Sequence, residues 1–324
     1  TNPAIDAGEQ DIMGEDLLVD CLPLRDVNII YKERSMWAMS YVGAPYIFRF
    51  QKLPGEYGML ARGCAENTPL GHVVMTAGDI IIHSGQGCTS IANAVIRNYI
   101  FSNISQTYYQ RSFVTSNPGK NEVWICFPFG SEASTCNRAA VWNWVDKTWA
   151  IRTLTNVTYG TTGKVNYSAS GIAWSDASTT WETQPGNWND YDYSPAESRL
   201  MLCHTNPYIS LADVGPTDFG SVITSTLERT GMHIDNPQNV KVCKAVYPRI
   251  DGTTGQTVQI EIGGSMTANV APTWSAPVTF TIGTDQKIDA FAAGRYLSVR
   301  FTHTGYSPWR IRSFDMDVQE QGKF

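Results

Sequence analysis

Two neighbouring stretches decide the fold: N-E-V-W-I-C-F-P-F-G (121–130) and R-A-A-V-W-N-W-V-D-K-T-W-A-I-R (138–152). In the first stretch Val123, Ile125 and Phe127 fall on one face of a strand, and the Trp and Cys between them fall on the other. This period of two is the side-chain repeat of a β-strand. The stretch therefore predicts a strand whose two faces are both apolar.

The second stretch predicts the rest of an antiparallel meander. A strand runs from Ala139 to Val145, a two-residue turn lies at Asp146-Lys147, and a third strand starts at Trp149. A sheet this small is only marginally stable alone in water. Similar units must pack against it, so we expect repeated meander blades of the kind that build a β-propeller.

Strand and turn patterns recur before and after this meander. A hairpin turns near Glu33–Ser35, a strand covers 46–53, and Ala77–Asp79 joins two further strands. The spacing of these units is about 40–50 residues, the range of propeller blades. One segment changes period: Thr89–Ile104 predicts a single helix capped by Thr89 or Ser90.

The pattern changes again near Val222, where the expected strands become longer. Six of them suit a β-sandwich-like module or closing blades; they cover 221–230, 240–250, 257–263, 278–283, 295–304 and 309–318. The prediction is an all-β chain with a β-propeller-like domain over 1–220 and a C-terminal β-rich module over 221–324. A propeller that is incomplete at its N-terminus is left open as an alternative.

Composition limits the function classes. Only 17% of the 324 residues are charged, against about 25% in typical soluble domains. The sequence also contains ten Trp and fifteen Tyr. A low charged fraction together with many aromatic residues indicates surfaces that contact other subunits. The net charge of −6 does not support a basic nucleic-acid-binding role. No apolar run reaches the ~18 residues of a membrane span.

The seven cysteines and five histidines show no ligand pattern. The cysteine count is odd and no C-x-x-C occurs, so we expect free, mostly buried thiols in a protein assembled in a reducing cytoplasm. A disulfide framework or a zinc site is the alternative. We expect no metal, no cofactor and no catalytic residues. The chain opens at Thr1 and not at Met, which favours a processed or truncated product.

The stretch N-W-N-D-Y-D-Y (187–193) is the candidate binding loop. Its aromatic rings can bury much area at an interface with little loss of entropy, so a subunit-interface loop is the first interpretation. Its carboxylates leave a glycan-binding or Ca²⁺ loop as the alternative. The candidate residues are Trp188, Asp190, Tyr191, Asp192 and Tyr193.

Two other motifs are weaker. Trp174–Trp181 partly matches the Asp box of sialidase-type propellers, a structural hairpin motif that carries no catalytic group. Asp315 and Asp317 lie two apart on a predicted strand and so point the same way. We interpret them as a solvated or interface face, with an acid–base pair as the alternative.

The order of several segments resembles the β-propeller tail proteins of short-tailed, podovirus-type bacteriophages. The matching segments are L-R-D-V-N-I-I-Y-K-E-R-S-M-W-A-M-S-Y-V-G (24–43), G-D-I-I-I-H-S-G (78–85), S-I-A-N-A-V-I-R (90–97), E-V-W-I-C (122–126), A-V-W-N-W-V-D-K-T-W (140–149) and 294–318. Proteins of this family are the hub or nozzle subunits at the distal end of the tail tube.

The resemblance implies a structural virion protein without enzymatic activity, located in the tail and assembled in the bacterial host cytoplasm. It implies a hexameric ring, a tubular or adaptor protein bound above it, a tail fibre or needle in contact with it, and double-stranded DNA passing through its lumen without sequence-specific binding. A lumen with few Lys and Arg would let DNA slide. The competing hypothesis is a carbohydrate-binding or glycan-cleaving propeller that recognises a receptor.

Overall fold

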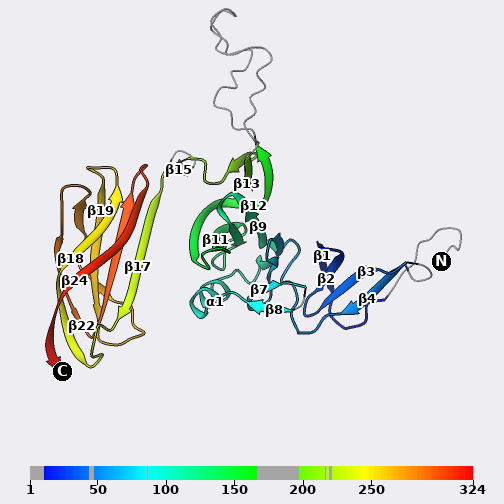
Figure 1. Cartoon of the computed structure of the whole chain (residues 1–324), viewed down its shortest axis with the longest axis horizontal. Coiled ribbons are helices and arrows are strands. Elements are labelled where there is room, and N and C mark those ends of the chain that lie inside the picture. Colours follow the sequence, from blue (N-terminus) through cyan, green and yellow to red (C-terminus); the bar gives the residue numbers. More distant parts are fainter. Residues whose placement is uncertain are drawn as a thin grey trace, which may run out of the picture. The chain divides into compact units, whose positions relative to one another are not determined.

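The computed structural model describes residues 11–43, 47–85, 87–165, 197–215, 217–218 and 221–323. The fold is all-β, built from several antiparallel sheets, with one α-helix in the described ranges. The chain divides into two compact units, Thr1–Ala212 and Asp213–Phe324, where the sequence analysis placed the boundary after residue 220. Each unit is described separately below (Figure 1).

The first unit contains three antiparallel meander sheets, one after another along the chain. The first sheet has the order β1-β2-β3-β4 and the second the order β5-β6-β7-β8. Their strands are β1 Leu18–Leu24, β2 Val27–Lys32, β3 Met36–Tyr41, β4 Phe48–Lys52, β5 Ala65–Thr68, β6 Gly71–Met75, β7 Ile80–His83 and β8 Cys88–Ser90. The predicted turns near Glu33–Ser35 and Ala77–Asp79 are confirmed, because strands end and begin on either side of them.

The third sheet contains the meander that opened the sequence analysis. Its order is β14-β13-β12-β11-β10-β9. The strands are β9 Phe113–Asn117, β10 Glu122–Phe127, β11 Cys136–Asn143, β12 Trp149–Val165, β13 Glu197–His204 and β14 Ile209–Leu211, with short 3₁₀ turns at Tyr109–Arg111 and Pro118–Lys120. The edge strand β9 also contacts β12 and β13 directly. The sheet is therefore rolled, and it encloses a core of its own.

The predicted alternation along β10 is confirmed by the two cores. Val123, Ile125 and Phe127 belong to a large core shared with the first two sheets and the helix. Trp124 and Cys126 belong to the separate core inside the rolled sheet, which also contains Phe113, Leu200 and Leu202. Both faces of β10 are buried from Val123 to Phe127, which is why the sequence carries apolar residues at each of these positions.

The turn after β11 differs from the prediction. A two-residue reversal at Asp146-Lys147 is wrong, because β11 already ends at Asn143 and β12 starts at Trp149. The Asn143 carboxamide oxygen accepts hydrogen bonds from the backbone N–H groups of Val145 and Asp146, both at 2.9 Å. This side-chain bonding competes with the strand ladder and ends the strand early.

The helix is shorter than predicted. It covers Ala94–Phe101 as α1, and its N-cap is Asn93, whose side-chain oxygen accepts from the Ile96 N–H. Thr89 and Ser90 do not cap it, because they pair with β7 as part of β8. Arg97 holds the helix to the β6–β7 turn through two bonds to the Asp79 carboxylate, of 3.1 and 3.0 Å.

The three meander sheets of the first unit contribute to one shared core, and their closure into a β-propeller stays a prediction. A β-propeller places typically four to eight four-stranded blades around a central channel. In the described part of this chain the first two sheets are four-stranded meanders and the third is a longer, rolled one.

The second unit is a sandwich of two antiparallel sheets. One has the order β17-β23-β19-β20, with β21 also paired to β19, and the other has the order β22-β18-β24. The strands are β17 Thr224–Met232, β18 Asn239–Gly252, β19 Thr257–Ser265, β20 Thr273–Trp274, β21 Val278–Thr281, β22 Ile288–Gly294, β23 Tyr296–Thr304 and β24 Trp309–Lys323; β15 Thr217–Asp218 and β16 Ser221–Val222 form a small separate hairpin. Leu297, Val299 and Phe301 face the buried core, as their alternation predicts.

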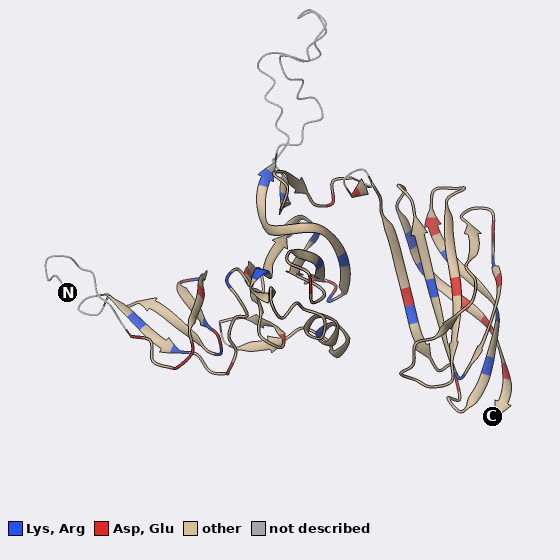
Figure 2. Cartoon of the chain, turned by 180° about the vertical axis from the view of Figure 1, so that it is seen from behind, with Lys and Arg blue, Asp and Glu red and all other residues tan. Residues whose placement is uncertain are grey.

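The outer faces of this sandwich carry charges of both signs (Figure 2). Asp315, singled out with Asp317 in the sequence, is exposed on β24 and bonds Arg249 at 2.9 Å. Exposed ion pairs of this kind contribute about 0–1 kcal/mol each. Such pairs keep this face of the sandwich hydrated.

Candidate interaction groove

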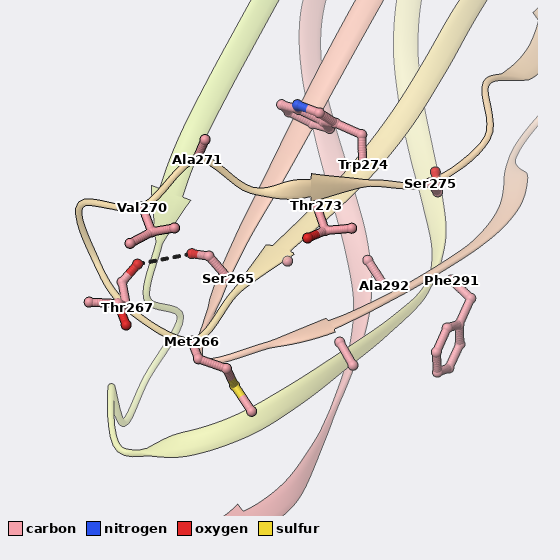
Figure 3. A pocket seen from close by; sticks show the side chains of 12 residues that line it. Ser265, Met266, Thr267, Val270, Ala271, Thr273, Trp274, Ser275, Phe291 and Ala292 are labelled. Atoms are coloured by element: carbon pink, nitrogen blue, oxygen red, sulfur yellow. Dashed lines mark hydrogen bonds between the residues drawn. The ribbon is translucent and has the colours of Figure 1, made fainter.

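An uncharged groove lies at one edge of the sandwich, between the loop that follows β19 and the edge strand β22 (Figure 3). Its volume is about 500 Å³. Twelve residues line it: Gly264, Ser265, Met266, Thr267, Val270, Ala271, Thr273, Trp274, Ser275, Phe291, Ala292 and Ala293. All of them come from the second unit, so the groove is complete within it.

Two glycines bring the walls of the groove together. A Cβ on Gly264 would lie 2.2 Å from the Ala293 carbonyl oxygen, and a Cβ on Gly294 would lie 2.6 Å from the Ser265 nitrogen. These distances are well inside van der Waals contact, so only glycine fits at either position. The backbones of β19 and β22 therefore meet at the end of the groove.

The opposite wall is held by Trp274 on β20. The ring lies over Gly263, where a Cβ would come within 2.9 Å of the indole. The Arg300 guanidinium lies over the ring, 4.0 Å from its centroid, and is itself paired with Glu228 at 3.1 Å and Glu261 at 3.2 Å. The two carboxylates thus hold the Arg300 guanidinium in position, and the guanidinium in turn holds the Trp274 ring by a cation–π contact.

The loop between β19 and β20 is closed by local hydrogen bonds. The Ser265 hydroxyl donates to the Thr267 carbonyl oxygen at 3.1 Å, as the dashed line in Figure 3 shows. The Val270 N–H donates to the same carbonyl at 3.4 Å. The loop therefore presents Met266 and Val270 outward on a closed turn.

The chemistry of the groove is that of a contact surface. None of its twelve lining residues is Asp, Glu, His, Lys, Arg, Cys or Tyr, so no group there can act as a general acid or base near neutral pH. Met266, Val270 and Phe291 are 56%, 59% and 66% exposed. Uncharged surface with exposed apolar side chains is what the centre of a protein–protein interface presents.

A second apolar surface lies in the first unit, where β3 and β4 meet at their shared end. Tyr41 is 72% exposed and Phe48 is 49% exposed, and their rings pack edge to face with centroids 6.1 Å apart. They face each other across the β3–β4 pair. Val42 and Ile47 beside them are also exposed. Large side chains on an exposed strand end favour a contact with another chain.

The loop predicted from the sequence cannot be placed beside these surfaces. Trp188, Asp190, Tyr191, Asp192 and Tyr193 lie outside the described residues, as does the Trp174–Trp181 motif. The interface and glycan hypotheses for that loop stay predictions.

Most of the cysteines are buried inside the fold. All seven cysteines are free, and Cys64, Cys126, Cys136 and Cys243 are buried. Burial raises the pKa of Cys64 to about 12, and burial also raises the pKa of Cys126 well above its ordinary range. Such thiols are protonated and unreactive. Within the described ranges, no group of three or more His, Cys, Asp or Glu residues is placed to hold a metal ion.

Sequence reasoning missed the groove because its walls are distant in the chain. The available signals were the pair Gly263-Gly264 and the small-residue run that ends at Gly294. Both mark a close backbone approach, but neither tells which strands approach each other.

Comparison with known proteins gives no match, either to a family model or to a curated protein. In the described part of the chain, no helix has the length and apolar character that crossing a membrane requires.

Proposed function

We propose that this chain is a structural subunit of the tail of a short-tailed bacteriophage, a nozzle or hub protein that forms a ring around the DNA-ejection channel. The single observation that carries the proposal beyond the segment resemblance is the uncharged groove with its exposed Met266, Val270 and Phe291. It offers a surface for assembly and no catalytic group.

Ring formation needs two different surfaces on each copy. A head-to-tail contact joins one patch to a different patch of the neighbour, and it closes into a ring when the rotation permits. The groove in the second unit and the Tyr41–Phe48 surface in the first unit are two such uncharged patches. Uncharged contact regions also suit copies that each carry a net charge of −6 and would otherwise repel.

The remaining partners follow from the proposed place in the tail. A tubular or adaptor protein would bind above the ring, a fibre or needle would contact it, and double-stranded DNA would pass through. Fixed Lys and Arg would hold the phosphates of passing DNA. The inward face of the ring is therefore expected to be acidic or polar.

Light scattering after size-exclusion chromatography, combined with negative-stain electron microscopy of the concentrated chain, tests the proposal. The expected result is a discrete oligomer seen as a ring with a central hole. A particle of one copy at every concentration, or an oligomer without a hole, would contradict it.

A further inference from the structure

The first unit contains a cavity lined by charged and hydroxyl side chains, which the proposed assembly role does not explain. It opens between β1 and the rolled third sheet and has a volume of about 630 Å³, within the range of small-molecule sites. Eleven residues line it, among them Asp20, Arg62, Arg111, Ser112 and Tyr159. All of the lining residues belong to the first unit.

The cavity carries one excess positive charge in an acidic chain. Arg111 is held in place because its guanidinium donates to the Ser134 carbonyl oxygen and lies over the Tyr108 ring, 4.9 Å from the centroid. Arg62 is exposed, and no hydrogen bond or ion pair of its side chain is found in the described ranges. Asp20 is the one carboxylate that lines the cavity.

The Asp20 carboxylate accepts two backbone hydrogen bonds and can accept further hydrogen bonds from a ligand. Its carboxylate oxygens accept from the backbone N–H groups of Cys21 at 2.9 Å and Gly63 at 3.0 Å. An ionised carboxylate has about four acceptor positions, so further hydroxyl donors can be accommodated. The hydrogen bond from the Gly63 N–H also holds the backbone next to Arg62 in place.

The rest of the wall combines an aromatic ring with hydroxyl groups. Tyr159 is 54% exposed, and its ring packs on Phe113 at a centroid distance of 5.5 Å. Ser112 is 1% exposed, and its hydroxyl has no hydrogen-bond partner in the described residues. A buried unpaired hydroxyl in a cavity wall is uncommon.

We propose that this cavity binds an acidic sugar, a pyranose ring that carries a single carboxylate. Two arginines against one aspartate leave one formal positive charge, which matches a carboxylate better than the roughly −1.5 to −2 charge of a phosphate monoester. Arg62 binds the carboxylate with its planar pair of donors. Tyr159 offers a flat apolar face to the ring, and Asp20 accepts from sugar hydroxyls. The inference goes beyond the assembly role and does not depend on it.

Calorimetric titration of the full chain with a galacturonate oligosaccharide tests the assignment, with the matching galactose oligosaccharide as the neutral probe. The acidic probe is expected to bind at least about tenfold more tightly than the neutral one. Arg62→Ala is expected to weaken its binding about tenfold, equal to about 1.4 kcal/mol. Tyr159→Ala is expected to weaken the binding of both probes. Arg49→Ala, which removes an exposed arginine of β4 outside the cavity, is the matched control and should change nothing.

Three results would overturn the assignment: no binding of the acidic probe, equal binding of the neutral probe, or unchanged binding by Arg62→Ala. Tighter binding of inorganic phosphate or of a mononucleotide would also overturn it in favour of a phosphate site. Arg62 is exposed and has no hydrogen bond or ion pair within the described ranges, so Arg62→Ala should keep the thermal melt of the parent chain, and that melt separates loss of binding from loss of fold. Light scattering reports assembly independently, so failure here leaves the ring proposal standing.

Discussion

The Tyr31 hydroxyl lies 2.9 Å from Nδ1 of His72 and joins the first meander sheet to the second. The other ring nitrogen, Nε2, lies 2.9 Å from the Pro23 carbonyl oxygen, which can only accept. Nε2 therefore carries the proton, and Nδ1 accepts from the tyrosine. Both side chains are fully buried, so this bond links the two four-stranded sheets where water cannot reach.

Tyr31→Phe should destabilise the first unit. The change removes the donor and leaves Nδ1 of His72 buried without a partner, at an expected cost of about 1–3 kcal/mol in the free energy of unfolding. Urea denaturation followed by tryptophan fluorescence measures it. Tyr41→Phe is the matched control, since that hydroxyl belongs to an exposed residue. Equal midpoints for the two variants would show that the sheet-to-sheet bond contributes nothing.

Stability should fall at acidic pH because of His72 and His83. Burial lowers the pKa of both imidazoles from 6.5, and the nearby His72 lowers that of His83 further. The unfolded chain then binds protons that the folded chain does not, so the stabilisation is complete above about pH 6.5 and is lost as the pH falls through the lowered values.

Measurement of the unfolding free energy between about pH 7.5 and pH 5 checks this expectation. The buried Glu66 acts in the opposite sense, because burial raises its pKa and its contribution falls as the pH rises above 4.5. The informative quantity is therefore the difference between the parent chain and His72→Gln. A pH profile unaltered by that substitution would contradict the assignment to His72.

Asp16→Ala should be among the most damaging substitutions in the first unit. Asp16 lies 2.9 Å from the Lys32 ammonium group, whose side chain is 2% exposed. Asp16 itself is half-buried, but its removal leaves the buried Lys32 ammonium group without a counter-charge, at an expected cost of up to about 3–5 kcal/mol. Asp315→Ala on the sandwich is the control, because its pair with Arg249 is exposed and is worth about 0–1 kcal/mol. Chemical denaturation of both variants gives the comparison; similar losses would contradict the burial argument.

These residues also show what the sequence can and cannot predict. The apolar residues from Val123 to Phe127 predict a strand that is buried on both faces, because successive side chains of a strand point to opposite faces. The same reasoning missed β1, β5 and β22. β1 carries Asp20 and Pro23, and β22 is rich in alanine, so neither matches the alternating apolar pattern. Tertiary contacts form those strands.

The groove was beyond sequence reasoning for a related reason. Phe291 and Val270 face one cavity only because Gly264 and Gly294 allow two strands to touch, and contact between distant strands leaves no local pattern. The loop with Trp188 and Tyr191 was predicted from local composition alone, and it lies outside the described residues. The all-β class was predictable, whereas the contact surfaces required the structure.

Gly264→Ala should push β19 and β22 apart at the edge of the sandwich. The added methyl group would lie 2.2 Å from the Ala293 carbonyl oxygen, and overpacking of this kind typically costs about 1–3 kcal/mol. Gly78→Ala is the control, because a Cβ there meets nothing within 4 Å. Hydrogen exchange should show faster exchange in β19 and β22 for Gly264→Ala alone. Unchanged protection of both strands would mean that the backbone contact does not hold the groove.

Phe291→Asp should weaken assembly strongly without unfolding the chain. The side chain is 66% exposed and lines the groove, so an exposed substitution there should change stability by no more than about 0.5 kcal/mol. A charge in the centre of an interface must be desolvated without a partner, which should weaken association by about 100-fold or more, roughly 2.7 kcal/mol. Light scattering over a concentration series measures the shift. Tyr306→Asp, at an exposed position outside the groove, is the matched control. Assembly that survives Phe291→Asp but is lost in Tyr306→Asp would place the interface elsewhere on the sandwich.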